Sequence, residues 1–338
     1  MKETESTLSN IVDPRFNDEL YGFDKIEKMF LNVIRNEKLS NAYIFYGIKG
    51  VGKATFAFRL ARFILNEDKK FDNKLFISKD NKIFKSVSSL NHPDFILING
   101  NNGVTKTISV DLLKTIQSST YKTSIESKYK VIIIDSIDDI TKSSSTNTLL
   151  KSLEDAPKNC IFLIIAHSIF KVPKTIQSRC QKIYFNPVNN EKFKNWFIQS
   201  KFIDDKNADT ILGLSNGSLG KAIEIINTKN FICICDQVDE IVKKIEEIDN
   251  DDIEKLFLMY ADNEINIENF LLIIQFQISK HIKGLIEKNH EINFLESYLS
   301  LFFEINKTFN FYKLYSLEPN QLLNKIKSCL LQYSKKYN

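Results

Sequence analysis

The sequence is poor in proline and glycine, and it has no long apolar run. Its 338 residues include six prolines, ten glycines and one tryptophan. No apolar stretch approaches the ~20 residues that a membrane-spanning helix needs. Residues 1–16, MKETESTLSNIVDPRF, lack the apolar centre of a secretory signal. We therefore expect a soluble, cytoplasmic protein with no membrane partner.

Cysteines are also few, and their spacing excludes the usual metal sites. They form no C-x-x-C pair and no Cys/His cluster of zinc type, and the segment 66–91 contains none. We expect reduced, partly buried thiols and no zinc. The five residues are Cys160, Cys180, Cys233, Cys235 and Cys329.

The excess of positive charge is small. Forty-six Lys and Arg residues stand against 42 Asp and Glu residues, giving a net charge of +4. This balance does not by itself indicate nucleic-acid binding. Hydrophobic residues make up 43% of the chain, enough for a globular interior, and the length suits two or three domains.

Short apolar runs alternate with helical patterns over residues 22–187. Continuous Ile, Val and Leu runs indicate strands covered on both faces, as in a parallel sheet. We predict an α/β fold with a polar, irregular insertion or hairpin over 66–91 and a mobile lead-in over 1–21. The strands are predicted at 42–46, 94–98, 130–135, 161–166 and 182–185, and helices at 22–36, 55–65, 110–118, 146–153 and 173–179.

The chain reads as wholly helical after the last predicted strand. We place domain boundaries near 187 and 229, giving a small helical domain over 188–228 and an all-helical domain over 229–338. Aromatic residues in the last domain are expected to pack helices rather than stack on bases. Its core candidates are Phe257, Leu258, Phe270, Leu271, Ile274, Leu295, Leu299, Phe302, Phe303, Leu322 and Leu330.

A phosphate-binding loop is the strongest local signal. Residues 47–53 read Gly-Ile-Lys-Gly-Val-Gly-Lys and fit the GxxxxGK pattern between a predicted strand and a predicted helix. Gly47, Gly50 and Gly52 allow the backbone to fold around phosphate oxygens. Amide groups at the helix start then point at the anion, and Lys53 reaches the β- and γ-phosphates. The pattern predicts a site for ATP or ADP.

Two groups that ATP hydrolysis needs are missing. Position 54 is Ala54, where Ser or Thr would bind Mg²⁺. The strand 130–135 ends in Asp135, a suitable metal-binding carboxylate, but the next residue is Ser136, and a hydroxyl is a poor general base at neutral pH. Asp138 and Asp139 are interpreted as a solvated helix N-terminus. We expect that any bound nucleotide is not hydrolysed, that no cofactor is required and that no metal is held.

Further motifs follow in a fixed order. They are His92-Pro93-Asp94, Val110-Asp111, residues 147–154 (NTLLKSLE), Ser178-Arg179-Cys180 and residues 217–222 (GSLGKA). This order resembles the clamp-loader subunits of bacterial DNA polymerase III, an AAA+ family, over roughly residues 22–225.

The resemblance implies an AAA+ P-loop domain over 22–187, a helical lid over 188–228 and a collar domain over 229–338. Catalytic members of the family keep Ser or Thr after the lysine, and Asp-Glu at the end of the third strand. Members of the delta prime type often lose both but keep Ser-Arg-Cys. This chain has the second pattern. It is therefore expected to lack intrinsic ATPase activity while belonging to a DNA polymerase holoenzyme, a nucleotidyltransferase.

The resemblance also assigns residues and partners. Arg179 would act in trans as an arginine finger on ATP bound to the neighbouring subunit, with an ordinary salt bridge as the alternative. Lys221 falls at the lid's sensor position, or is a solvated lysine. His167 is either a polar sensor or a polar residue at a strand end. The implied partners are gamma/tau and delta subunits in a hetero-pentamer, with the sliding clamp and primed DNA.

Two other functions stay open from the sequence. One is a catalytically active, gamma/tau-like ATPase subunit of a clamp loader. The other, a nucleotide-binding protein of another P-loop class, agrees less well with the helical segments after the last strand.

Overall fold

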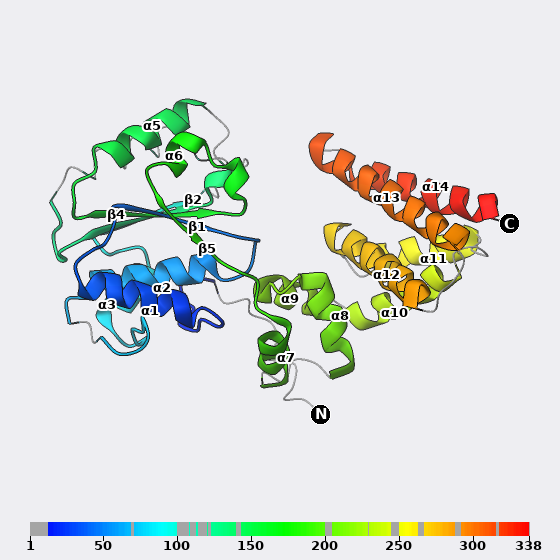
Figure 1. The fold of residues 1–338 in the computed structure, drawn as a ribbon, viewed down its shortest axis with the longest axis horizontal. Helices are drawn as coiled ribbons and strands as arrows, with labels where there is room; N and C mark the ends of the chain where they lie inside the picture. Colours follow the sequence, from blue (N-terminus) through cyan, green and yellow to red (C-terminus); the bar gives the residue numbers. More distant parts are fainter. Residues whose placement is uncertain are drawn as a thin grey trace. The chain divides into compact units, whose positions relative to one another are not determined.

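The computed structural model describes most of the chain, as two compact units (Figure 1). One unit holds the described residues up to 193 together with 217–221, and the other holds those of 194–216 and from 222 onward. The predicted helix over 110–118 and residues 1–12 of the lead-in lie outside the described residues, except for position 113. The described residues are 13–68, 71–99, 108, 113, 120, 123–139, 143–199, 205–228, 230–244, 250–262, 267–287, 292–315 and 318–337.

A five-stranded parallel sheet forms the centre of the first unit. Its strands stand in the order β2-β3-β4-β1-β5. All four neighbouring pairs are parallel, so the predicted α/β fold with a parallel sheet is confirmed. Each strand lies within one residue of its predicted range: β1 Ala42–Tyr46, β2 Phe95–Asn99, β3 Lys130–Asp135, β4 Cys160–Ala166 and β5 Gln181–Tyr184.

Helices cover both faces of this sheet (Figure 1). On one face lie α1 (Asp24–Arg35), α2 (Lys53–Leu65) and α3 (Lys82–Ser88), and on the other α5 (Ser143–Glu154) and α6 (Lys174–Gln177). Each face has its own apolar core, one rich in phenylalanine and the other in isoleucine and leucine. The continuous apolar runs of β3 and β4 follow from this arrangement, because neither face of these strands meets water. Two short 3₁₀ helices, Ile137–Asp139 and Ile169–Lys171, follow β3 and β4.

The segment 66–91 is not a purely irregular insertion. It contains α3, which begins at the cap residue Asn81, whose side chain accepts a hydrogen bond from the N–H of Ile83. Leu75, Phe84 and Val87 are buried and extend the phenylalanine-rich core. The expectation of an irregular insertion or hairpin is therefore wrong for residues 82–88. With Ile77, the segment contributes four core positions that stand among many lysines and asparagines.

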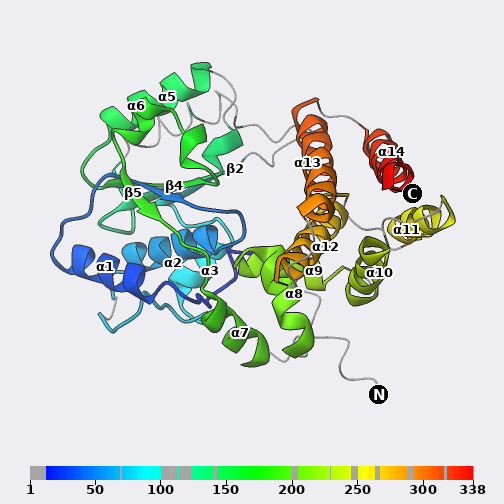
Figure 2. The same cartoon turned by 45° about the vertical axis from the view of Figure 1, so that its right-hand side comes forward.

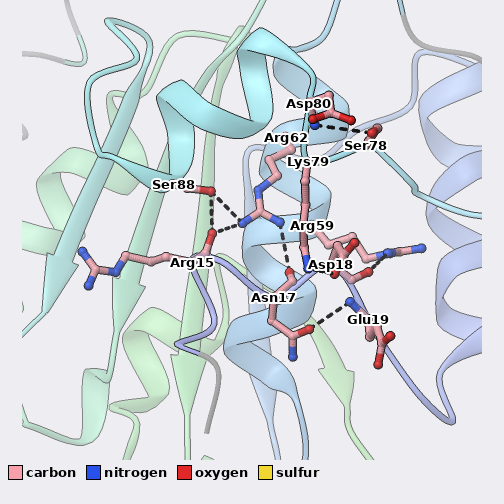
Figure 3. A network of polar contacts seen from close by, with 10 residues as sticks. All are labelled: Arg15, Asn17, Asp18, Glu19, Arg59, Arg62, Ser78, Lys79, Asp80 and Ser88. Atoms are coloured by element: carbon pink, nitrogen blue, oxygen red, sulfur yellow. Dashed lines mark hydrogen bonds and ion pairs between the residues drawn. The ribbon is translucent and has the colours of Figure 1, made fainter. Parts of the chain in front are cut away.

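The N-terminal segment 13–20 is anchored to α2. Arg62 is almost fully buried and donates hydrogen bonds to the backbone oxygens of Arg15 and Asn17 and to the Ser88 hydroxyl (Figure 3). The Nη1–O distance to Asn17 is 3.1 Å. Burial lowers the pKa of Arg62 to about 10. The expectation of a mobile lead-in is therefore wrong for residues 13–20.

A second arginine on α2 strengthens this attachment. Arg59 forms a buried ion pair with Glu27 of α1 at 2.7 Å and also donates to the backbone oxygen of Asp18. The Glu27 carboxylate accepts a further bond from the N–H of Leu75. Two buried arginines thus join the N-terminal segment, α1 and the segment before α3 to the helix that follows the phosphate loop.

The described regular elements after β5 are all helices, as predicted (Figure 2). None of the described helices is long and apolar enough to cross a membrane. Phe270, Leu271, Ile274, Leu322 and Leu330 are buried as expected, and Phe257, Leu295 and Phe302 are half-buried. Leu258, Leu299 and Phe303 are exposed, so these three are not core residues. The predicted boundaries near 187 and 229 stay predictions. The helices are α7 Asn190–Gln199, α8 Asp205–Ser215, α9 Leu219–Ile226, α10 Phe231–Lys243, α11 Asn250–Asp262, α12 Ile267–Glu287, α13 Ile292–Tyr315 and α14 Pro319–Tyr337.

The five cysteines are free thiols, and four of them are buried. Burial raises the pKa of the Cys160, Cys180 and Cys235 thiols to about 12. These groups therefore behave as small apolar side chains. Cys233 is exposed on α10 while Cys235 is buried, as their spacing on a helix requires.

Candidate functional site

The phosphate loop and Asp135 meet at the same edge of the sheet. β1 ends at Tyr46, which pairs with Ala166 at the end of β4. β3 ends at Asp135, one residue beyond Ile134, which pairs with Ile164. The carboxyl ends of these three strands are therefore level. This edge is where open α/β sheets bind their ligands.

Close packing explains two of the three loop glycines. Gly47 has φ +149°, and a Cβ there would lie 2.4 Å from the backbone oxygen of Phe185. Gly50 has φ +81°, and a Cβ there would lie 2.5 Å from the Ser218 hydroxyl. Gly52, with φ +107°, immediately precedes α2. The loop thus has the glycine positions and the helix start of a phosphate cradle.

Lys53 lies inside this loop and is 3% exposed. Its ammonium group donates hydrogen bonds to the backbone oxygens of Gly47 at 2.6 Å and Ile48 at 2.8 Å. Burial lowers the pKa of Lys53 to about 8, against the opposing effect of the Asp135 and Asp138 carboxylates. The loop therefore encloses a cation that is mostly charged at neutral pH.

Residues 217–221 pack directly on the phosphate loop. The Ser218 hydroxyl donates to the backbone oxygen of Lys49 at 2.8 Å. The N–H of Gly220 donates to the backbone oxygen of Gly50 at 2.9 Å. The N–H of Lys221 in turn donates to the Ser218 hydroxyl at 3.2 Å. This places the backbone of Lys221 beside the loop. Lys221 was predicted from the family resemblance. No local pattern in the sequence indicates the hydrogen bond from Ser218 to the phosphate loop.

The residues after Asp135 form a hydrogen-bonded turn. The Ser136 hydroxyl donates to the Asp138 carboxylate at 2.8 Å, which also accepts the backbone N–H groups of His167 and Ser168. Burial disfavours the charged form of Asp138, but these hydrogen bonds outweigh it and keep its pKa below the ordinary value. The interpretation of Asp138 as a solvated helix terminus is wrong, because its carboxylate fixes the ends of β3 and β4 to each other.

Arg179 lies at the opposite edge of the sheet from the phosphate loop. It precedes Gln181, which pairs with Tyr43 near the start of β1, whereas the loop begins after Tyr46 at the end of β1. At ~3.3 Å per residue, the four steps along the strand from Tyr43 to Gly47 alone span ~13 Å. The structure therefore brings Gly47, Gly50, Gly52, Lys53, Asp135 and the backbone of Lys221 together but keeps Arg179 apart from them.

The Arg179 guanidinium is part-exposed and has defined contacts. One nitrogen, Nη1, donates to the backbone oxygen of Thr175 at 3.0 Å and to the Ser178 hydroxyl at 3.4 Å. The other, Nη2, forms an ion pair with Glu154, the last residue of α5. The next residue, Cys180, is buried in the isoleucine-rich core. The Ser-Arg-Cys motif thus combines one packed side chain with one that faces solvent.

The His-Pro-Asp motif has a structural role. The buried Asp94 carboxylate accepts three backbone N–H groups, from Ile125, Glu126 and Ser127, at 2.8–2.9 Å. His92 accepts the N–H of Asp94 through Nδ1 at 3.1 Å. These bonds fix the loop before β3 to the start of β2, at the edge away from the phosphate loop.

Comparison with known proteins identifies the α/β region. The protein-family model for "DNA polymerase III, delta subunit" matches residues 22–189, which cover the α/β region up to the start of α7. The chain is 27% identical to DNA polymerase III subunit gamma/tau of Mycoplasma genitalium, over 94% of this chain and 57% of the relative. It is 28% identical to DNA polymerase III subunit delta' of Bacillus subtilis, over 61% of this chain and 60% of the relative.

The chain thus spans less than two thirds of the length of these relatives. Among solved structures, a DNA polymerase III gamma subunit-related protein of Thermotoga maritima matches with a TM-score of 0.47 and 13% identity, over 91% of this chain and 99% of that one. The matched family, the two relatives and the motif order agree. Residues 22–189 of the chain belong to the family of clamp-loader subunits of DNA polymerase III.

Proposed function

We propose that this chain is a delta prime-type clamp-loader subunit, one that does not hydrolyse ATP itself. It stands beside an ATPase subunit and supplies Arg179 to the nucleotide bound there. Its partners are gamma/tau and delta subunits in a hetero-pentamer, which together load the sliding clamp on primed DNA during replication.

The observation that carries this proposal is the composition of the phosphate site. Ala54, the second residue of α2, carries a methyl group where a metal-binding hydroxyl is needed. Ser136 follows Asp135, and its hydroxyl is engaged by Asp138. One loss could be compensated by a neighbouring group. Two losses around one bound phosphate leave neither a complete metal site nor a base for water.

The position of Arg179 supports its action on a second subunit. The guanidinium lies near the amino edge of the sheet, while its own phosphate loop lies at the carboxyl edge. It therefore has no route to an anion held by Lys53 of the same chain. A guanidinium that reaches a neighbour's transferring phosphoryl group stabilises charge developing in the transition state, an effect of about 10³–10⁵-fold in related reactions.

The loop itself still suits an anion. Gly47, Gly50, Gly52 and Lys53 would hold the phosphates of ATP or ADP, with Asp135 and Lys221 at the margin. The bound nucleotide would supply phosphate charge to the loop and would stay intact. Its function would be structural, since it would rest on the same loop that residues 217–221 contact.

The alternative is a catalytically active, gamma/tau-like ATPase subunit. The gamma/tau relative of Mycoplasma genitalium matches along more of the chain than the delta' relative does. Lys53, which such a subunit requires, is present and enclosed in the loop. This reading needs another group to replace the metal ligand and the base.

ATP turnover by the pure protein separates the two functions. We expect no Mg²⁺-dependent hydrolysis above that of Lys53→Ala. In the assembled loader, Arg179→Ala should slow hydrolysis, whereas Lys174→Ala, which removes an exposed cation from the preceding helix α6, should not. Turnover by the isolated chain that Lys53→Ala abolishes would support the ATPase alternative. An unchanged rate for the Arg179→Ala loader would remove the finger assignment.

A further inference from the structure

Arg179 is held in one orientation although its side chain is 39% exposed. An exposed arginine normally samples many rotamers, and ordering it costs up to about 2 kcal/mol of side-chain entropy. Here the backbone oxygen of Thr175 fixes Nη1 and the carboxylate of Glu154 fixes Nη2. The two fixed points lie on different nitrogens, so together they set the direction of the guanidinium plane.

The backbone positions on both sides of this ion pair are fixed independently of it. Leu149 and Leu153 of α5 are buried in the same core as Ile176 of α6 and Cys180. Packing therefore holds the end of α5 against the segment that carries the arginine. An exposed ion pair adds only about 0–1 kcal/mol to stability. Its main effect is on the orientation of the Arg179 side chain rather than on the fold.

Enough donors remain for a phosphate. A guanidinium has five N–H groups. The contacts with Thr175, Ser178 and Glu154 use at most three of them. At least two are left for a phosphate oxygen presented from outside the chain, without any rearrangement of the arginine.

We propose that Glu154 is a positioning residue for Arg179: its carboxylate holds the guanidinium in the orientation that meets the neighbouring subunit's nucleotide. This inference rests on the proposed function of Arg179. Glu154 does not touch the nucleotide and acts only through the arginine. Glu154 is the last residue of α5, the helix that follows the Asp135–Asp138 turn in the sequence. Its ion pair therefore links α5 to the guanidinium that is offered to the neighbouring subunit.

The test is a double-mutant cycle in the fully assembled loader, read as kcat and KM for ATP. Glu154→Gln should lower kcat about three- to tenfold with KM unchanged, because the arginine must then be ordered at each turnover. In the Arg179→Ala background, Glu154→Gln should have no further effect. Asp155→Asn, which removes the adjacent charge, is the matched control, and the melting temperatures of the isolated variants should agree with wild type.

The outcomes distinguish the positioning role of Glu154 from the proposed function of Arg179. If Arg179→Ala slows the loader and Glu154→Gln does not, the positioning inference is overturned and the proposed function stands. The inference is also overturned if Glu154→Gln accelerates hydrolysis, or if it slows both backgrounds equally. If Arg179→Ala itself has no effect, the proposed function of the arginine has failed, whatever Glu154 does.

Discussion

The Ser218 hydroxyl donates a hydrogen bond to the backbone oxygen of Lys49, 169 positions earlier in the chain. With the bond from the N–H of Gly220 to the oxygen of Gly50, it places a segment of the predicted lid on the phosphate loop. The carbonyl oxygens of four successive loop residues, 47–50, thus accept hydrogen bonds from Lys53 or from this segment. These four hydrogen bonds stabilise the shape of the loop.

Gly50→Ala should detach residues 217–221 from the loop. The new Cβ would meet the Ser218 hydroxyl and would require a left-handed backbone, so we expect a loss of about 1–3 kcal/mol in the free energy of unfolding. Urea unfolding and amide hydrogen exchange at 217–221 measure it. Gly284→Ala, with no atom within 4 Å of its Cβ, is the control and should stabilise α12 by about 0.5–1 kcal/mol. Unchanged exchange at 217–221 would contradict the prediction.

Lys53 should give the protein a distinctive dependence of stability on pH. Its pKa is about 8 in the folded protein and 10.5 ordinarily, so the unfolded chain binds more protons between these values. Stability should therefore rise with pH from about 8 to 10.5. Relative to Lys53→Met, the wild type should gain about 2 kcal/mol between pH 7.5 and pH 10, measured by urea unfolding. A constant difference between the two proteins would show that the folded pKa is ordinary.

Asp94→Asn should destabilise the protein by about 3 kcal/mol, because the three backbone N–H groups lose a charged acceptor. The new side-chain NH₂ group would also replace one acceptor oxygen with a donor that points at a backbone N–H. The measurement is chemical unfolding of the isolated protein. Asp80→Asn, an exposed carboxylate of the same unit, should change stability by less than about 0.5 kcal/mol. Equal effects of the two substitutions would refute a structural role for the His-Pro-Asp motif.

Arg62→Met should release the N-terminal segment. The variant leaves the backbone oxygens of Arg15 and Asn17 without their guanidinium donor, and we expect a loss of about 2–4 kcal/mol. Limited proteolysis should then cleave within 13–20, where the wild type resists. Arg35→Met, at an exposed site on α1, should leave both the cleavage pattern and the stability unchanged.

Local sequence patterns were sufficient to predict the strands of the sheet. The runs AYIFY and KVIIID are continuous apolar segments of strand length, and a parallel strand buried on both faces requires such a run. The phosphate loop was likewise predictable, because its glycines and lysine lie within seven residues between a strand and a helix. These features are encoded by neighbours in the chain.

Contacts between distant residues were not predictable in this way. Nothing near Ser218 indicates Lys49, and nothing near Asp138 indicates the backbone of His167. The helix α3 was missed because its buried positions, Phe84 and Val87, stand among lysines, serines and asparagines. In each case the partner comes from another element, so only the folded chain defines the role of the residue.

The placement of Arg179 and the phosphate loop at opposite edges of one sheet constrains how such chains associate. In a heterologous interface, each protomer contacts the next through a different surface. Under the proposed function, association through these groups is directional, because each protomer offers its guanidinium to the phosphate loop of the next one. The first protomer in such a row needs only the surface that carries Arg179. A chain without its own hydrolytic groups can therefore take the first position, and the nucleotide site of the next protomer still receives an arginine.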